Sequence, residues 1–244
     1  MIKVTFIGTG NMKSRTRANN SILVDDLLFD CGMGTVKQIE RLGYNTKDIN
    51  YVVISHFHPD HILDIQGLIL ARRIRNETVS KLYIIGPVGL KEVLNKLVLL
   101  TGSNDIDALA KQANLEFIEL TPNETVSLGE TNLTAYEVDH GDMKPSYGYL
   151  LEKADKVIGY SGDTVICDNL HKMSEKADYM LVDAHSLETR AGRHATFKEV
   201  KDLADKYPNC QFYAIHRSDY EVKDPGKVNI PIDGDIINIK EDNQ

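Results

Sequence analysis

Apolar positions along the chain follow two kinds of period. Short runs rich in β-branched and aromatic residues predict strands over 2–7, 22–24, 27–29, 51–54, 82–85, 115–120, 131–138, 147–151, 157–160, 179–182 and 212–215. Apolar residues at helical spacing predict helices over 36–42, 62–74, 88–100, 105–113, 165–176 and 196–207. Thr196 with Glu199 three residues later is typical of a helix start. Because strands outnumber helices in both halves, the pattern indicates sheets covered by helices.

The chain carries no internal repeat, low-complexity tract or linker, so we expect one domain over 1–244. Its composition, 42% hydrophobic and 26% charged, is ordinary for a globular protein. We find no apolar run long enough to cross a membrane and no secretory signal. The three cysteines form no CxxC pair, which favours a reducing compartment, and we expect a cytoplasmic location. The net charge of −8 weighs against a broad nucleic-acid-binding face.

The stretch Ser55–His61 holds three of the eight histidines and one aspartate. It lies between the strand expected at 51–54 and the helix expected from Ile62, on a loop of the kind that carries functional groups. In an extended segment the side chains of His56 and His58 point the same way, while Asp60 and His61 follow at the start of the helix. Imidazoles and a carboxylate at this density would be costly to bury without a cation, and they suit zinc or a similar metal.

Further candidate ligands stand at the ends of predicted strands. His140 follows 131–138, Asp163 follows 157–160, and His216 follows 212–215. Each also has an ordinary interpretation, as a surface, turn or helix-contact residue. Together they supply the side chains that a two-metal site needs beyond the first loop.

Charged residues on two other segments favour solvent exposure over substrate contact. Residues 11–20 include Lys13 and two arginines and are expected to form an exposed loop. His185, Arg190 and Arg193 lie on the loop after 179–182, where contact with a substrate phosphate is the alternative. We expect His171 to face solvent.

These motifs resemble the metallo-β-lactamase superfamily. The pattern His56-x-His58-x-Asp60-His61 is followed by His140, Asp163 and His216, as in that superfamily. The resemblance covers essentially the whole chain, from Gly8 to His216. The resemblance implies an α+β fold, the αββα four-layer sandwich, with metals at one edge of the sheets. It implies that one ion is bound by His56, His58 and His140, and the other by Asp60, His61 and His216, with Asp163 bridging.

Within that superfamily the chain is most similar to the ribonuclease Z type of phosphodiesterase. Asp30-Cys31-Gly32-x-Gly34-Thr35 resembles its glycine loop, Ser161-Gly162-Asp163-Thr164 its bridging-aspartate motif, and His194-Ala195-Thr196 its His-x-Thr motif. Asp183 stands where that group carries an acidic partner for the catalytic histidine. The chain departs from the pattern at Met33 and at Asp183-Ala184-His185. Only 22 residues separate His140 from Asp163, which leaves no room for a tRNA-binding arm.

The resemblance implies a dinuclear hydrolase in which a metal-bound hydroxide attacks a phosphodiester. Asp60 would orient the nucleophile, His194 would assist the leaving oxygen, and Asp183 would hold His194 in one tautomer. We expect a small or single-stranded phosphodiester substrate, such as a cyclic nucleotide. The alternatives are a carbonyl hydrolase acting on a lactone, thioester or β-lactam, a tRNA 3′-processing endonuclease, and a non-catalytic binding protein.

The expected cofactor is two divalent ions per chain, most simply Zn²⁺, with Mn²⁺ or Fe²⁺ as alternatives. A homodimer is also implied. The substrate-binding residues and the physiological substrate stay open.

Overall fold

The computed structural model of the protein describes residues 1–102 and 105–240. The expected domain over 1–244 also includes 103–104 and 241–244, which lie outside the described residues. The strands are β1 (Ile2–Gly8), β2 (Ser21–Val24), β3 (Leu27–Phe29), β4 (Tyr51–Val53), β5 (Leu82–Pro87), β6 (Leu115–Leu120), β7 (Thr125–Leu128), β8 (Thr131–Glu137), β9 (Tyr147–Lys153), β10 (Lys156–Tyr160), β11 (Tyr179–Asp183), β12 (Gln211–Ile215), β13 (Val228–Asn229) and β14 (Ile236–Ile239). The helices are α1 (Thr35–Arg41), α2 (Pro59–Ile62), α3 (Ile65–Ile74), α4 (Leu90–Leu100), α5 (Ile106–Ala113), α6 (Asp168–Lys176) and α7 (Phe197–Lys206), with a 3-10 turn at Thr46–Asp48.

The strands of the described residues form two sheets of seven. The first sheet has the order β14-β1-β2-β3-β4-β5-β6, and the second has the order β13-β12-β11-β10-β9-β8-β7. The sheets pack face to face through large aromatic side chains. Phe29 stacks on Tyr160 with ring centroids 4.7 Å apart, and Phe6 lies 5.8 Å from Tyr213.

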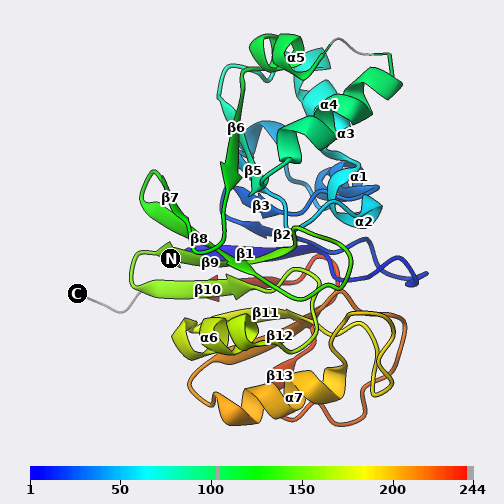
Figure 1. The fold of residues 1–244 in the computed structure, drawn as a ribbon, viewed down its shortest axis with the longest axis vertical. Helices are drawn as coiled ribbons and strands as arrows, with labels where there is room; N and C mark the ends of the chain where they lie inside the picture. Colours follow the sequence, from blue (N-terminus) through cyan, green and yellow to red (C-terminus); the bar gives the residue numbers. More distant parts are fainter. Residues whose placement is uncertain (103–104, 241–244) are drawn as a thin grey trace.

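Helices cover the outer face of each sheet (Figure 1). Helices α1, α3, α4 and α5 bury Ile39, Leu68, Leu94 and their neighbours against the first sheet. Helices α6 and α7 bury Met173, Val200 and others against the second sheet. Two helical layers around two sheets confirm the expected αββα sandwich.

The predicted elements agree with the structure except at a few positions. The helix expected over 62–74 breaks into α2 and α3, because the amide of Asp64 donates to the carbonyl oxygen of Cys31 (2.9 Å). Helix α6 begins at Asp168, since Cys167 is extended (φ −138°). Strands β7 and β13 at the edges of the second sheet and β14 at the edge of the first escaped prediction because they are short and partly exposed.

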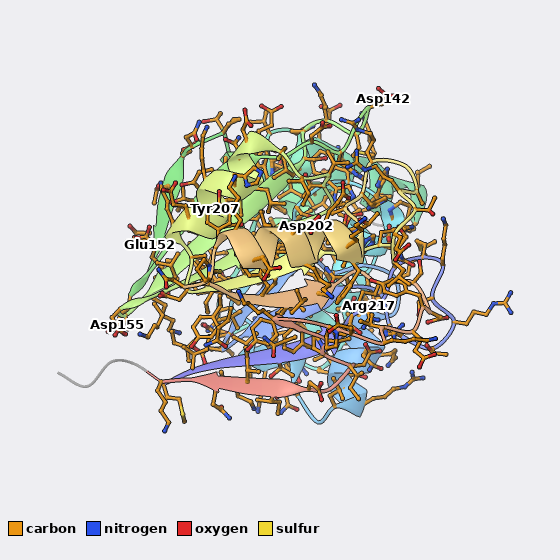
Figure 2. All side chains as sticks on the ribbon, turned by 90° about the horizontal axis from the view of Figure 1, so that it is seen from below. Asp142, Glu152, Asp155, Asp202, Tyr207 and Arg217 are labelled. Atoms are coloured by element: carbon orange, nitrogen blue, oxygen red, sulfur yellow. The ribbon has the colours of Figure 1, made fainter. Side chains whose placement is uncertain are left out.

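The strand ends that precede the candidate ligands meet at one end of the sandwich. Strands β10, β11 and β12 are parallel, and β8 runs in the same direction because β9 pairs antiparallel with both β8 and β10. Figure 2 shows Arg217, which follows β12, toward the right-hand end, with Glu152 near the end of β9 and Asp155 of the β9–β10 turn at the opposite end. The topology therefore places the residues after β8, β10, β11 and β12 together. No helix among the described residues has the length and apolar character to cross a membrane.

Candidate metal centre

The loop between β4 and α2 places four candidate ligands at this end. Its backbone turns into α2 at Pro59, which occupies the first turn of the helix, after an extended His58 (φ −66°, ψ 151°). His56, Asp60 and His61 are buried, and His58 is half-buried. The sequence motif therefore becomes one compact wall of the site.

The second sheet supplies the opposite wall. His140 lies beyond β8, Asp163 beyond β10, and His216 directly after β12, and all three are buried. This burial excludes the surface interpretation of His140. His216 adopts a left-handed backbone (φ 53°), a conformation uncommon outside glycine and typical of functional positions.

Three imidazoles and one carboxylate form a group that we call the nitrogen-rich group: His56, His58, His140 and Asp163. The Nδ1 atom of His58 lies 2.9 Å from His56 Nε2 and 3.1 Å from His140 Nε2. Asp163 Oδ2 lies 3.8 Å from His56 Nε2. Two nitrogen ligands of one tetrahedral zinc ion lie about 3.3 Å apart, so these spacings suit a single ion.

Hydrogen bonds on the far side of the rings set their tautomers. The hydroxyl of Ser55 donates to Asp30 (2.8 Å), so its oxygen accepts from Nδ1 of His56 (3.0 Å). His140 donates from Nδ1 to the backbone carbonyl of Arg193 (3.0 Å). The Nε2 atoms of His56 and His140 therefore turn lone pairs toward His58 Nδ1, an arrangement that a cation stabilises.

A second set consists of Asp60, His61 and His216. We call it the carboxylate-rich group because the carboxylates of Asp30, Asp163 and Asp183 also lie against its two histidines. Asp60 Oδ2 lies 3.4 Å from His216 Nε2 and 3.6 Å from His61 Nε2. Asp163 reaches this group too, with Oδ2 3.3 Å from His61 Nε2 and Oδ1 3.4 Å from His216 Nδ1. Asp163 thus stands between the two groups, where a bridging ligand would stand.

Asp30 supports both groups and was not among the predicted site residues. Its buried carboxylate accepts from Nδ1 of His61 (2.7 Å), from the amide and hydroxyl of Ser55 (2.8 Å each) and from the hydroxyl of Tyr160 (2.5 Å). Asp30 is left-handed (φ 57°). The signal that could have found it is an acidic residue at the end of a predicted strand, directly before the glycine loop.

The glycine loop lies tightly against the ligand loop. A Cβ atom on Gly32 would fall 1.7 Å from the carbonyl oxygen of Asp60, so only glycine fits there. The neighbouring amide of Cys31 donates to the carbonyl of His61 (2.7 Å). The sequence similarity of this loop to a known motif therefore reflects close backbone packing.

The structure brings His194 and Asp183 together beside these groups. The Nδ1 atom of His194 lies 2.8 Å from Asp183 Oδ2, while Asp183 Oδ1 lies 3.3 Å from His216 Nδ1. Asp163 Oδ2 is 3.8 Å from His194 Nδ1. Donation from Nδ1 to Asp183 leaves Nε2 of His194 available for a substrate.

Charges differ between the two groups. Burial, reinforced by His61, lowers the pKa of His56 well below its usual value, and burial and His140 lower the pKa of His58. Burial acts in the same direction on His61, but the carboxylates of Asp163 and Asp30 outweigh it and raise that pKa. Asp163 and Asp183 likewise outweigh burial at His216 and raise its pKa to about 10.

The donor set fits divalent ions. The buried atoms His61 Nε2 and Asp163 Oδ1 have no hydrogen-bond partner among the residues that the structure describes. Buried polar atoms normally have partners, so these two indicate a ligand that is not part of the chain. Histidine nitrogens and carboxylate oxygens are the donors that first-row divalent metals take.

Other predicted positions stand apart from this centre. Arg190 pairs with Glu199, and Arg193 pairs with Asp139. His171 is half-buried, with Nδ1 3.1 Å from the hydroxyl of Tyr207, rather than fully solvent-facing.

His185 corrects the expectation of an exposed loop residue. It is buried, and burial together with His194 and His216 lowers its pKa to about 4. Its ring stacks on His194, with centroids 4.1 Å apart. The sequence carried one signal, the departure from the family pattern at Asp183-Ala184-His185.

Comparison with known proteins agrees with this picture. A family model described as anti-Pycsar protein Apyc1 matches residues 2–229. Ribonuclease Z of Mycolicibacterium gilvum is 30% identical over 226 residues, which cover 86% of this chain and 78% of that protein.

Two solved structures share the fold. The metallo-β-lactamase fold protein YhfI of Bacillus subtilis superposes with a TM-score of 0.80 at 20% identity, over 97% of this chain and 98% of that one. A diphosphatase of the PhnP family superposes with a TM-score of 0.81 at 20% identity, over 99% of both chains.

Fold, donor set and relatives together define the class. The protein is a ribonuclease Z-like member of the metallo-β-lactamase superfamily and a metal-dependent hydrolase. Within that class, the chain belongs to the anti-Pycsar protein Apyc1 family.

Proposed function

We propose that this protein is a phosphodiesterase that uses two divalent ions on a small phosphodiester. The observation that carries the proposal is the His194–Asp183 pair, whose 2.8 Å contact stands beside Asp163. A histidine whose Nδ1–H is held by a carboxylate is oriented, and stabilised in its protonated form, to protonate a leaving alkoxide from Nε2, and a phosphodiester has such a leaving group. The relatives support phosphorus chemistry as well, since they include a ribonuclease and a diphosphatase.

In this proposal the nitrogen-rich group would hold one ion and the carboxylate-rich group the other, with Asp163 between them. Divalent ions in such a site supply Lewis-acid chemistry: they make water acidic enough to ionise near neutral pH and polarise phosphoryl oxygens. Asp60 would orient the attacking water. His194 would act in its doubly protonated form: Nδ1–H would stay bound to Asp183, which holds the ring, and the proton of Nε2 would go to the leaving oxygen.

The chain between His140 and Asp163 supports a small substrate. Strands β9 and β10 of the second sheet take up most of that segment, so it carries no arm of the kind that grips tRNA. The net charge of −8 also disfavours a long polyanion. Cyclic nucleotides are therefore the substrate class that we place first, ahead of single-stranded nucleic acid and of tRNA 3′ ends.

The test measures metal content and hydrolysis of bis-p-nitrophenyl phosphate on one preparation, with a lactone and a thioester as comparison substrates. We expect two ions per chain, hydrolysis of the phosphodiester, and activity near background in Asp163→Ala. Two ions with hydrolysis of only the lactone or thioester would replace the proposal with a carbonyl hydrolase. An inactive protein that holds no metal after Zn²⁺ or Mn²⁺ addition would overturn it.

The proposal also includes zinc as the native ion, one hydrolase domain over 1–244, and a homodimer. Elemental analysis of protein purified without added metal tests the first. Limited proteolysis tests the second, and size-exclusion chromatography with light scattering tests the third. The cytoplasmic location stays a prediction.

A further inference from the structure

One buried histidine at the edge of the site has no role in the proposed chemistry. His185 follows β11, is 7% exposed, and lies with its ring nearly parallel to that of His194 (interplanar angle 23°). One nitrogen of its ring belongs to a cluster with Asp183, His194 and His216 in which the donor atoms lie within 4.8 Å of one another. The ring therefore borders the place where a substrate would meet His194.

Asn11 determines which nitrogen of His185 carries the hydrogen. The amide hydrogen of Lys13 points to Asn11 Oδ1 (3.0 Å), which fixes the orientation of the Asn11 side chain. Its Nδ2 atom therefore faces His185 Nδ1 (3.0 Å), and it also lies near the carbonyl of His216 (3.2 Å) and the hydroxyl of Ser218 (2.9 Å). Because Nδ2 can only donate, Nδ1 of His185 holds a lone pair and Nε2 holds the hydrogen.

That Nε2 atom is buried and has no hydrogen-bond partner within residues 1–102 and 105–240. A buried N–H donor without a partner is costly, so a fold that holds one in place beside a site normally provides it with a ligand. His61 Nε2 and Asp163 Oδ1 share this property, and both lie among the candidate ligands, 3.3 Å from Asp163 Oδ2 and 3.4 Å from His216 Nδ1 respectively. His185 differs from them because Asn11 holds its neutral ring in the tautomer whose free nitrogen carries the hydrogen, and that nitrogen cannot bind a metal ion in this tautomer.

We propose that the Nε2–H group of His185 binds the substrate, by donating a hydrogen bond to an anionic phosphoryl oxygen next to His194. This inference rests on the proposed function and adds a substrate-binding residue to it. A hydrogen bond to a charged oxygen is stronger than one between neutral groups, and this contact would be made in the ground state and the transition state alike. His185 therefore contributes to affinity and not to the rate of the chemical step.

Two substitutions separate the N–H group from the ring. His185→Gln keeps an N–H donor of similar reach but removes the stacked ring. His185→Phe keeps an aromatic ring against His194 but removes the donor. His171→Phe on α6 is the matched control, because His171 contacts Tyr207 and lies outside the metal centre.

The experiment titrates inorganic phosphate into the metal-loaded proteins by calorimetry and measures bis-p-nitrophenyl phosphate kinetics in parallel. We expect His185→Phe to weaken phosphate binding and raise KM by roughly 10- to 100-fold, with kcat changed little. His185→Gln should stay within about threefold of the wild type, because the hydrogen bond to the phosphoryl oxygen is retained. His171→Phe should change neither quantity, and metal content should be the same in all four proteins.

Three results would overturn the inference. If His185→Gln is the impaired variant and His185→Phe is not, the ring acts by stacking on His194. A loss of bound metal in both variants would make His185 a ligand. Phosphate that binds neither the wild type nor the variants would remove the premise. A wild type that binds phosphate through His185 but hydrolyses no phosphodiester would refute the proposed function alone, because the calorimetry does not depend on turnover.

Discussion

The two ligand groups face each other across one site but differ in what surrounds them. In the nitrogen-rich group, burial and neighbouring imidazoles lower the pKa of His56 and His58. In the carboxylate-rich group, nearby carboxylates raise the pKa of His61 and His216. The first group therefore offers lone pairs to a cation at neutral pH, whereas the second holds protons until a cation displaces them. We therefore expect the ion in the carboxylate-rich group to bind more weakly at neutral pH, and with a steeper pH dependence, than the ion in the nitrogen-rich group.

The largest expected effect concerns a residue outside both groups. His194 shares Asp183 with His216, yet its Nε2 atom is proposed to serve the substrate. We expect His194→Ala to lower kcat by about 10²- to 10⁴-fold while both ions stay bound. Steady-state kinetics and elemental analysis on the same samples provide the measurement.

His171→Ala serves as the control for His194→Ala and should leave kcat unchanged. Loss of one ion in His194→Ala would show that His194 is a metal ligand of the carboxylate-rich group and not the residue that protonates the leaving oxygen.

A smaller effect should fall unequally on the two groups. Asp30 accepts directly from His61, but it reaches His56 only through Ser55. Asp30→Asn keeps the size and tolerates the left-handed backbone, yet its amide cannot accept from all these donors. We expect the affinity for the ion in the carboxylate-rich group to fall roughly 10- to 100-fold, and the affinity for the ion in the nitrogen-rich group to fall less. Competition with a chromophoric chelator resolves the two binding constants.

The matched control is Asp25→Asn. Asp25 is also left-handed (φ 52°) and accepts from the amide of Lys3 (3.0 Å) and from Lys153, but it lies in the β2–β3 turn, away from the centre. It should leave both affinities unchanged. Equal losses for both ions in Asp30→Asn would show that the two groups are supported alike.

Much of this centre could be predicted from the sequence because four of its candidate ligands lie on one short loop. His56 to His61 fit in six residues, so their convergence follows from a strand, a turn and a proline. The other wall required the topology, since His140, Asp163 and His216 meet only because the strands before them end at the same edge. The strand predictions made that inference reasonable, and the structure brings those side chains within a few ångströms.

What the sequence could not supply is the support behind the ligands. The contacts of Asp30 with Tyr160 and of Asn11 with His185 join residues 130 and 174 positions apart. Nothing in the local pattern marks either pair, because a hydrogen bond between distant segments depends on how the sheets pack. The prediction of an exposed His185 was wrong for the same reason: its ring packs between Asn11 and His194, which belong to other segments of the chain.

The pH dependence of metal binding tests the charge difference directly. Free histidine titrates near 6.5, and a pKa of about 10 keeps His216 protonated in the metal-free protein at pH 7 to 8, while the raised pKa of His61 favours its protonated form. Filling the carboxylate-rich group should therefore release protons, and its affinity for the ion should rise about tenfold with each unit of increasing pH for each proton released. Calorimetry in buffers of different ionisation enthalpy counts these protons. The nitrogen-rich group should release fewer.

The same protons stabilise the metal-free fold. Between pH 6.5 and about 10, folded His216 binds a proton that the unfolded chain has lost, so the stability of the metal-free protein should fall as pH rises through this window. Chemical denaturation at pH 7 and pH 9 measures the change. If stability is unchanged and no protons are released, both groups start neutral and the comparison fails.

The smallest effect should come from a side chain beside the nitrogen-rich group. His140 donates to the backbone carbonyl of Arg193, which any residue would provide. The side chain of Arg193 pairs with Asp139, but these side chains are 50% and 41% exposed, and exposed ion pairs contribute little. We expect Arg193→Ala to change the affinity for either ion by less than about threefold, which corresponds to under about 1 kcal/mol. The chelator competition used for Asp30→Asn applies unchanged. A loss of affinity as large as that in Asp30→Asn would show that the nitrogen-rich group also depends on a supporting side chain. A negligible loss would mean that the main-chain carbonyl supporting His140 tolerates side-chain substitution, whereas the Asp30 side chain supporting His61 does not.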